Sequence, residues 1–266
     1  MRLYLAVARS SFRRFSTYRW ATVTGVFVNS IFGVIRSFVL LAVWAHNPNI
    51  GGYDAIDAVT YCWLTQSLIM TTGIFGGGYV DELAERLRSG DIVVDLYRPT
   101  DLQAWWLASE LGRATFGFLG RGVPPTIIGA LLFHLRFPGS VWVWLLFLLS
   151  AFIGVVVGFA IRFVVNLAAF WLVDSRGITF LVNTAGMFLS GFILPLTMFP
   201  DRLADVARAL PWATMIQTPV DVFLGQAHGW ALVESFGRAI GWAVVLMLLG
   251  RAILRVATRR LVVQGG

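Results

Sequence analysis

The chain has 266 residues, of which 58% are hydrophobic and 13% are charged, and its mean hydropathy is +0.75. This composition excludes an ordinary soluble domain and predicts an all-α integral membrane protein, with room for about six spanning helices and no separate soluble domain. The net charge of +7 comes from 21 basic residues, all arginine, and in a membrane protein it indicates loop orientation rather than nucleic acid as a partner. The single cysteine, Cys62, lies in an apolar run, which excludes an intramolecular disulfide and leaves packing as its role.

Residues 1–20 predict an amphipathic helix that lies in the membrane interface. At about 100° per residue, apolar side chains share one face and arginines share another: Tyr4, Ala8, Phe12 and Phe15 against Arg2, Arg9 and Arg13. The arginines leave no apolar stretch long enough to cross the bilayer or to serve as a cleavable signal.

Six apolar runs follow, and each is long enough to cross a bilayer, which takes roughly 20 residues. They are residues 21–45, 56–79, 104–133, 141–173, 178–199 and 230–254. We expect all six to be spanning helices. In the third, Pro124 and Pro125 remove backbone donors and predict a kink or break that leaves room for a cavity or a bend.

Two glycine pairs have the small-xxx-small spacing that lets helices approach closely. They are GVVVG at 154–158 and GRAIG at 237–241. We expect close helix packing at these positions, and a dimer seam is one of the alternatives.

Arginines in the predicted loops are unequally distributed between the two sides of the membrane. If the amino terminus is cytoplasmic, that side carries Arg2, Arg9, Arg13, Arg14, Arg19, Arg86, Arg88, Arg98, Arg176, Arg255, Arg259 and Arg260, and the other side carries Arg136, Arg202 and Arg208. Because arginines accumulate in cytoplasmic loops, this distribution predicts that both termini and residues 81–103 are cytoplasmic.

Residues 200–229 are too apolar for a solvated outer loop. Asp201 is placed to begin a short amphipathic helix that Pro211 ends, and apolar side chains recur from there to Leu224. We expect a re-entrant hairpin that enters the outer leaflet and is covered by protein, because unpaired backbone groups are costly in lipid.

No pattern of catalytic or metal-binding residues is visible in the sequence. None of His46, His134 and His228 has a second ligand at the spacing of a metal site, and no G-x-S-x-G motif occurs. The chain has no lysine, which excludes a P-loop. We therefore expect a protein that is not an enzyme and that itself binds no cofactor and no metal.

Three charged residues, Arg36, Arg121 and Arg162, fall well inside predicted spans. Because a charge inside a bilayer is costly, each should face protein or a wet cavity. All three are candidates for a substrate path, with structural pairing as the alternative, for example of Arg162 with Asp174. Arg121 is the best candidate, since the helix-breaking prolines follow it. The acidic residues lie toward the ends of spans, which argues against an ion-coupled carrier.

The highly charged segment DELAERLRSGDIVVDLYRPTDLQ, residues 81–103, separates the second and third apolar runs. A helix over residues 81–90, ended by Gly90, would place Leu83 and Leu87 on one apolar ridge. We interpret this helix as a surface for a cytoplasmic partner, with a solvated connector as the alternative.

The rest of this segment carries further local signals. Glu82 and Arg86 have the i,i+4 spacing of a helical ion pair. An extended stretch is expected to follow, and Thr100 with Gln103 predicts a capping box at the start of the third span.

Two stretches resemble a known family, the membrane subunits of type-2 ABC exporters, and within it the bacterial permeases without an ATPase on the same chain. The first is RLRSGDIVVDLYRP at 86–99, and the second is GFILPLTMFPDRLADVARALPWATMIQTPVDVFLGQ at 191–226. In the second, the residues whose spacing is similar to that of the family are Pro195, Pro200, Pro211, Pro219 and Gly225. The resemblance extends over the whole chain in the number and order of spans.

The resemblance implies one permease domain over residues 1–266, in the bacterial cytoplasmic (inner) membrane. Residues 1–20 would be the elbow helix, 81–90 a coupling helix seated in a separate ATP-hydrolysing subunit, and 200–229 the outer re-entrant helices. The residues expected to contact that subunit are Glu82, Leu83, Glu85, Arg86, Leu87, Arg88 and Asp91. Two ATPases, which bind ATP and magnesium, and a second permease, identical or a paired homologue, would complete the complex among membrane lipids.

Two other functions remain open on the sequence alone. An ion-coupled secondary transporter is the first, and a non-transporting membrane scaffold or an intramembrane enzyme is the second. With 11 Trp and 21 Phe, apolar cavity walls suit amphipathic drugs, lipids or secondary metabolites, although lipid-facing helices are also apolar.

Overall fold

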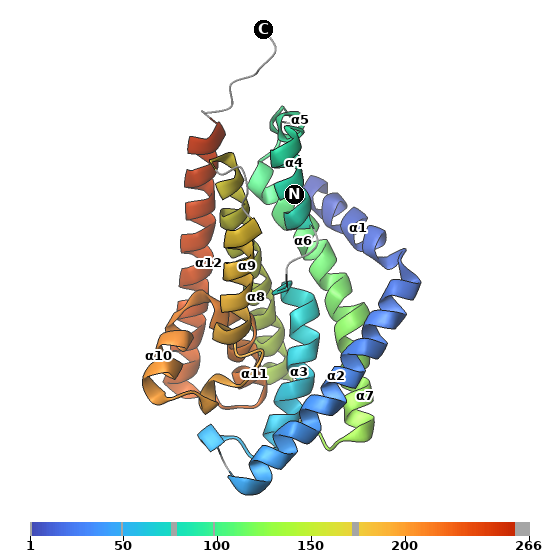
Figure 1. The fold of residues 1–266 in the computed structure, drawn as a ribbon, viewed down its shortest axis with the longest axis vertical. Coiled ribbons are helices and arrows are strands. Elements are labelled where there is room, and N and C mark those ends of the chain that lie inside the picture. The colour runs from blue at the N-terminus through green and yellow to red at the C-terminus, as the bar shows by residue number, and fades with distance from the viewer. Residues whose placement is uncertain (1, 49, 76–78, 98, 172–175, 259–266) are drawn as a thin grey trace.

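The fold is a bundle of helices in a computed structural model, which describes residues 2–48, 50–75, 79–97, 99–171 and 176–258. Within these residues all regular elements are helical, which confirms the expected fold class. Helices α8 and α12 pack along one another, and α2 is inclined to them (Figure 1). Helices α4 and α5 and the end of α12 lie at one end of the bundle, and α10 and α11 lie toward the other.

The helices follow one another with short connections. They are α1 (Arg2–Ser16), α2 (Arg19–His46), α3 (Ala55–Thr72), α4 (Tyr79–Ser89), α5 (Ile92–Leu96), α6 (Leu102–Phe116), the π-helix η2 (Gly117–Gly122), α7 (Val123–Leu132), α8 (Val141–Leu167), α9 (Arg176–Leu189), α10 (Asp201–Ala209), α11 (Gln217–Phe223) and α12 (Gly229–Thr258). Short 3-10 turns complete the chain, among them Leu196–Met198 and Pro211–Met215.

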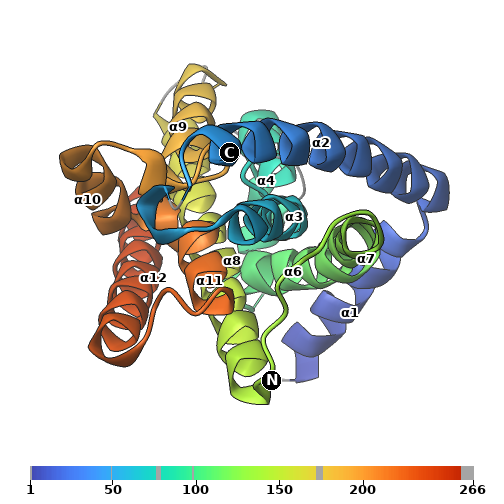
Figure 2. The same ribbon diagram turned by 90° about the horizontal axis from the view of Figure 1, so that it is seen from below.

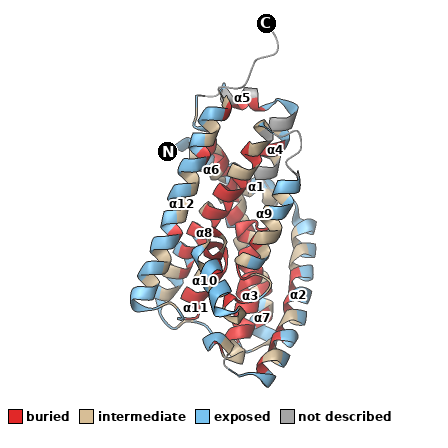
Figure 3. Ribbon diagram, turned by 60° about the vertical axis from the view of Figure 1, so that its left-hand side comes forward, coloured by how far each residue is buried: buried red, intermediate tan, exposed pale blue. Residues whose placement is uncertain are grey.

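In the described part of the chain, three helices are long and apolar enough to cross a membrane: α2, α8 and α12, with 28, 27 and 30 residues. They correspond to the first, fourth and sixth predicted spans. Figure 3 shows that α12 is mostly exposed, whereas α3, α8 and α11 are largely buried. The exposed apolar side chains of α2 and α12 therefore form surfaces suited to lipid or to another membrane protein.

Helix α3 lies in the centre of the bundle (Figure 2), between α2, α7, α8 and η2. Fifteen of its 18 residues are buried, including Cys62, whose expected role in packing is confirmed. A capping box of Asp54 and Asp57 begins the helix, and Gly73 ends it in the left-handed conformation, with φ of 66°. The helix therefore ends before residue 79, the limit expected from the apolar run.

The predicted third span is helical throughout but changes its hydrogen bonding in the middle. Between α6 and α7, the π-helix η2 contains wider turns, and the Val123 N–H donates to the carbonyl of Phe118. Pro124 and Pro125 lie in the first turn of α7, where missing backbone donors cost little. The prolines therefore do not break the helix as expected, and the local irregularity is the π-helix that precedes them.

The predicted fifth span is only half helical. Helix α9 has 14 residues, or about 21 Å, which is shorter than the roughly 30 Å hydrocarbon core of a bilayer. Gly191, with φ of 86°, leads into an irregular segment up to Phe199. The expectation of one continuous helix over 178–199 is therefore wrong in its second half.

The two glycine pairs have different surroundings. A Cβ at Gly154 would lie 2.8 Å from the Thr214 carbonyl oxygen, and one at Gly158 would lie 2.9 Å from that of Thr72. The first pair therefore lets α8 pack closely against this chain's own segments. Gly237 and Gly241 on α12 are exposed, with open space where a Cβ would stand.

Helix α1 packs against α6 through its apolar face. Val7 and Ser11 are buried, and the Ser11 hydroxyl donates to the carbonyl of Ser109. Gly112 on α6 leaves room for the Ala8 carbonyl, with which a Cβ would collide. The expected polar face of α1 is confirmed, since its arginines Arg2, Arg9 and Arg13 are exposed.

We predict that Gly112→Val separates α1 from α6, because the added side chain must displace the Ala8 backbone. Overpacking of this kind costs about 1–3 kcal/mol, and thermal unfolding in detergent would show it as a lower Tm. Gly237→Val is the matched control, since open space surrounds that position. Equal Tm values for the two variants would contradict the close packing of α1.

Candidate functional site

The charged segment forms two helices, α4 and α5, at one end of the bundle (Figure 1). The expectation of an extended stretch after α4 is wrong, because residues 92–96 form a helical turn. Ile92 is 1% exposed, and the Asp95 carboxylate accepts a hydrogen bond of 2.9 Å from Nη1 of Arg86. This turn therefore folds back against α4.

Helix α4 is anchored by Leu83, which is fully buried in the chain's own core. The side chains that pack with it come from α5, α6 and the end of α8: Ile92, Leu102, Trp106, Phe159, Phe163 and Leu167. The expectation that Leu83 inserts into a partner therefore needs correction, because aromatic side chains of α6 and α8 already cover it. The side chain of Leu87 lies outside the described part of the structure.

Charged side chains form the outer face of this segment. The expected pair of Glu82 and Arg86 is present, at 3.8 Å, and Arg14 of α1 donates to the other Glu82 oxygen at 3.0 Å. Glu85 and Asp91 are exposed, whereas the side chain of Arg88 is not among those described. Exposed ion pairs of this kind contribute little to stability, so a partner can engage these charges at little cost to the fold.

The capping box expected from Thr100 and Gln103 is wrong. Asp101 caps α6 instead, and its carboxylate accepts a 2.6 Å hydrogen bond from the Ala104 N–H. Because the helix begins one residue later than expected, Gln103 turns inward. Its Nε2 donates to the carbonyl of Met247 on α12 at 3.0 Å.

A buried ion cluster joins three helices just inside the α4 segment. Glu110 of α6 is fully buried, and one of its oxygens lies 2.6 Å from Nη2 of Arg113 and 2.6 Å from Nη2 of Arg162 on α8. Nε of Arg113 donates to the other oxygen at 2.9 Å. Asp174, the partner considered for Arg162, lies outside the described residues, and Glu110 pairs with this arginine.

The same guanidinium groups cap the carboxyl end of α3. Arg113 donates to the carbonyls of Met70 and Thr71 at 3.1 and 2.8 Å, and Arg162 donates to that of Thr72 at 3.2 Å. The last carbonyls of a helix lack partners within it and attract cations. The cluster therefore fixes the end of α3 against α6 and α8.

Sequence reasoning missed the role of Arg113 and placed Glu110 merely toward a helix end. The available signal was the i,i+3 spacing of a glutamate and an arginine inside an otherwise apolar helix. Such a pair on one face of a membrane helix indicates a buried ion pair.

The guanidinium group of Arg36 binds backbone carbonyls of its own chain. Its Nη2 donates to the carbonyls of Phe192 and Ile193 at 2.6 and 3.3 Å, and its guanidinium lies 4.8 Å from the centre of the Phe192 ring. These carbonyls belong to the irregular segment after α9. The alternative of structural pairing is thus favoured over a substrate path for Arg36.

Arg121 lies in the π-helix η2, and its surroundings differ from those of Arg36 and Arg162. Among the described residues, none forms a hydrogen bond or an ion pair with it, and its Nε is buried without a partner. It borders a cavity of about 320 Å³ near the joint between α1 and α2. This position agrees with a role in binding.

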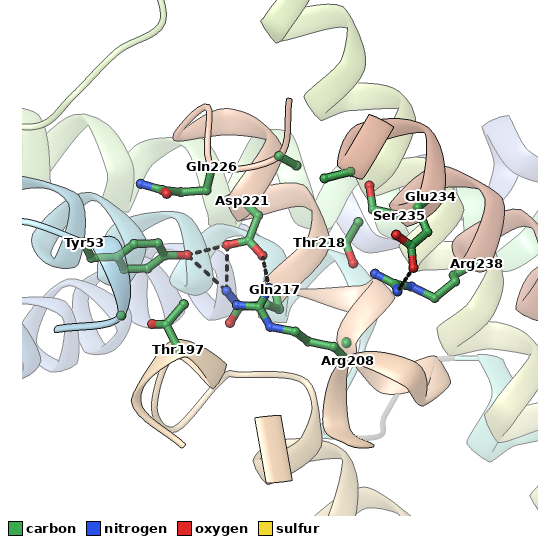
Figure 4. A pocket seen from close by; sticks show the side chains of 14 residues that line it. Tyr53, Thr197, Arg208, Gln217, Thr218, Asp221, Gln226, Glu234, Ser235 and Arg238 are labelled. Carbon is green, nitrogen blue, oxygen red and sulfur yellow. Dashed lines mark hydrogen bonds and ion pairs between the residues drawn. The ribbon is translucent and has the colours of Figure 1, made fainter. Parts of the chain in front are cut away.

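A second group of polar side chains lies at the opposite end of the bundle (Figure 4). Nε2 of Gln217 donates to the Asp221 carboxylate at 2.7 Å and to the Tyr53 hydroxyl at 3.0 Å, and that hydroxyl donates to the same carboxylate. Oε1 of Gln217 accepts from Tyr61 and from the Leu196 N–H. Sequence reasoning described this segment as apolar and missed the network.

These side chains border a smaller cavity of about 240 Å³, with Arg208 and Arg238 at its edge. Helix α10 runs from Asp201 to Ala209, which confirms the short helix expected before Pro211. Within the described ranges, no three histidine, cysteine or acidic side chains are grouped to hold a metal ion.

We predict that Glu110→Ala strongly destabilises the protein, because it leaves two buried guanidinium groups without their carboxylate. Removing one partner of a buried ion pair costs about 3–5 kcal/mol. Thermal unfolding in detergent would detect the loss. Glu234→Ala removes half of an exposed pair with Arg238 and should change stability by less than about 1 kcal/mol. Similar losses in both variants would contradict the structural role of the cluster.

A family model described as ABC-2 family transporter protein matches residues 31–265, which extend from within α2 beyond the end of α12. No curated protein matches the chain. The matched region includes the α4 segment, the ion cluster and Arg121. The chain belongs to the ABC-2 family of transporter proteins.

Proposed function

We propose that this chain is the permease subunit of an ATP-driven exporter and that separate ATPase subunits bind at α4 and α5. The observation that carries the proposal is the two-sided structure of α4. Its outer face presents exposed charges, and its inner face is anchored by Leu83 against α6 and α8. Membership of the ABC-2 family supports an ATPase as the kind of partner.

The anchor gives α4 the mechanical connection that a coupling element needs. Leu83 lies in one hydrophobic cluster with Trp106, one turn before Glu110, and with Phe163, which follows Arg162. A force on α4 would therefore act on α6 and α8 together, because the ion cluster joins these helices. Displacement of α6 and α8 would also move the end of α3, because its carbonyls accept hydrogen bonds from Arg113 and Arg162.

The proposal includes an arrangement of the whole complex. Two permeases and two ATPases would assemble, with ATP and magnesium bound by the ATPases and a substrate path between the permeases. The second permease, an identical chain or a homologue, would cover exposed apolar surface such as that of α12. The α4 end and both termini would be cytoplasmic, in the bacterial inner membrane, with six membrane crossings and residues 200–229 re-entrant from outside.

An ion-coupled carrier is the principal rival, and it needs an ionisable group that can exchange ions during transport. Glu110 is buried in the bundle, but two guanidinium groups already occupy both of its oxygens. This arrangement supports a structural counter-ion rather than an exchanging group. An ion-coupled carrier, a scaffold or an intramembrane enzyme would require no ATPase, so a bound ATPase separates the proposed function from both rivals.

We predict that the double variant Glu85→Arg, Asp91→Arg loses its ATPase, because it reverses two exposed charges on the outer face of the segment. Affinity purification in detergent, followed by mass spectrometry, would identify the chains that remain bound. Asp205→Arg, an exposed reversal on α10 at the other end, is the control and should retain them. Absence of any ATPase from the wild-type complex would overturn the proposed function.

We also predict the orientation of the chain. A cysteine at Ser89, in α4, should react with a membrane-impermeant reagent only from the cytoplasm, and one at Asn47 only from outside. Both positions are exposed, and the native Cys62 is buried, so it should contribute no background. Labelling of the two variants on the reversed sides would contradict the cytoplasmic location of α4.

A further inference from the structure

The cavity beside Arg121 has walls of apolar and aromatic side chains and a volume of about 320 Å³. Ligand pockets in proteins typically occupy about 300–1,000 Å³. Three parts of the chain form it: the joint between α1 and α2, the end of α3, and the region of α6 and η2. The residues that line it include Phe15, Tyr18, Phe75, Phe116 and Arg121.

Arg121 brings a charge into this apolar space. Its Nε is buried without a hydrogen-bond partner, and no described residue forms an ion pair with its guanidinium. The other arginine at the cavity, Arg113, is already bound by Glu110 and by backbone carbonyls. The side chain of Arg121 is partly buried, and a buried polar atom without a partner is unfavourable, so an anionic ligand in this cavity would complete the interactions of the guanidinium.

Two local features hold the Arg121 guanidinium at the cavity. The π-helix η2 places it there, and isolated π-helical turns frequently occur at functional sites. On the facing helix α2, Gly25 leaves the space that the guanidinium occupies, since a Cβ at that position would collide with it. The arginine is therefore packed against α2 rather than free in the cavity.

The surroundings of the cavity indicate where its ligand would come from. Tyr18 and Trp20, at the start of α2, are 65% and 85% exposed. Exposed aromatic side chains at the end of a spanning helix are typical of the membrane interface, where lipid headgroups lie. The neighbouring α1 is amphipathic and carries exposed arginines, as helices that lie on membranes do.

We propose that this cavity binds an amphiphile with an anionic headgroup, whose phosphate or carboxylate pairs with Arg121 and whose apolar chain lies along the aromatic walls. A guanidinium offers two parallel N–H donors to such a group. The proposal concerns binding and does not depend on ATP-driven export.

The test compares lipids on the purified protein in an uncharged detergent, with native mass spectrometry as the readout. Short-chain phosphatidylglycerol should be retained about tenfold more strongly than short-chain phosphatidylcholine, as expected for one charge-assisted interaction. Arg121→Gln should remove this preference, and Arg121→Lys should restore part of it. Arg9→Gln, which removes an exposed arginine of α1 outside the cavity, should retain the tightly bound lipid.

A second variant keeps the test independent of the charge change. Ala21→Phe, on α2, should fill part of the cavity and expel the lipid while leaving Arg121 in place. An unchanged lipid preference in both Arg121→Gln and Ala21→Phe would overturn the proposal. Inorganic phosphate is the remaining competitor, and if it displaced the lipid at equal concentration, a free anion rather than an amphiphile would be the occupant and the proposal would fail.

Discussion

The buried carboxylate of Glu110 is the constraint on which the arrangement of the central helices depends. It lies between Arg113 and Arg162, and both of these arginines also bind the last carbonyls of α3. One anion therefore permits two cations to close the end of a helix inside an apolar bundle. Without it, the positive charges would repel one another at the point where α3, α6 and α8 meet.

Polar side chains also bind unpaired backbone groups in the segment that follows α9. The segment after α9 is irregular, so its backbone groups need partners from elsewhere. Arg36 binds the carbonyls of Phe192 and Ile193, and Oε1 of Gln217 accepts from the Leu196 N–H. Arg36 was a candidate for a substrate path, and Gln217 lies in the segment expected to form an apolar hairpin. Both side chains instead bind backbone groups where helices end.

The sequence predicted the helical class, the approximate positions of the strongly apolar helices and the charged segment, because hydrophobicity and helix signals are local. It did not predict that Leu83 is internal, since an apolar ridge looks the same whether its own chain or a partner covers it. Arg113 was missed because a pairing across α3, α6 and α8 depends on tertiary contacts. Arg121 remained the candidate because its neighbouring prolines indicated space, and a cavity is present there.

The anchoring of α4 has a consequence for how such a complex can diversify. Leu83 faces the chain's own core, while Glu85 and Asp91 face outward. In the proposed complex, substitutions on the outer face would therefore alter the choice of subunit without disturbing the attachment of α4 to the bundle. Related permeases in one cell could acquire separate ATPases by exchanging a few surface charges, and an engineered swap of specificity would need to change only that face.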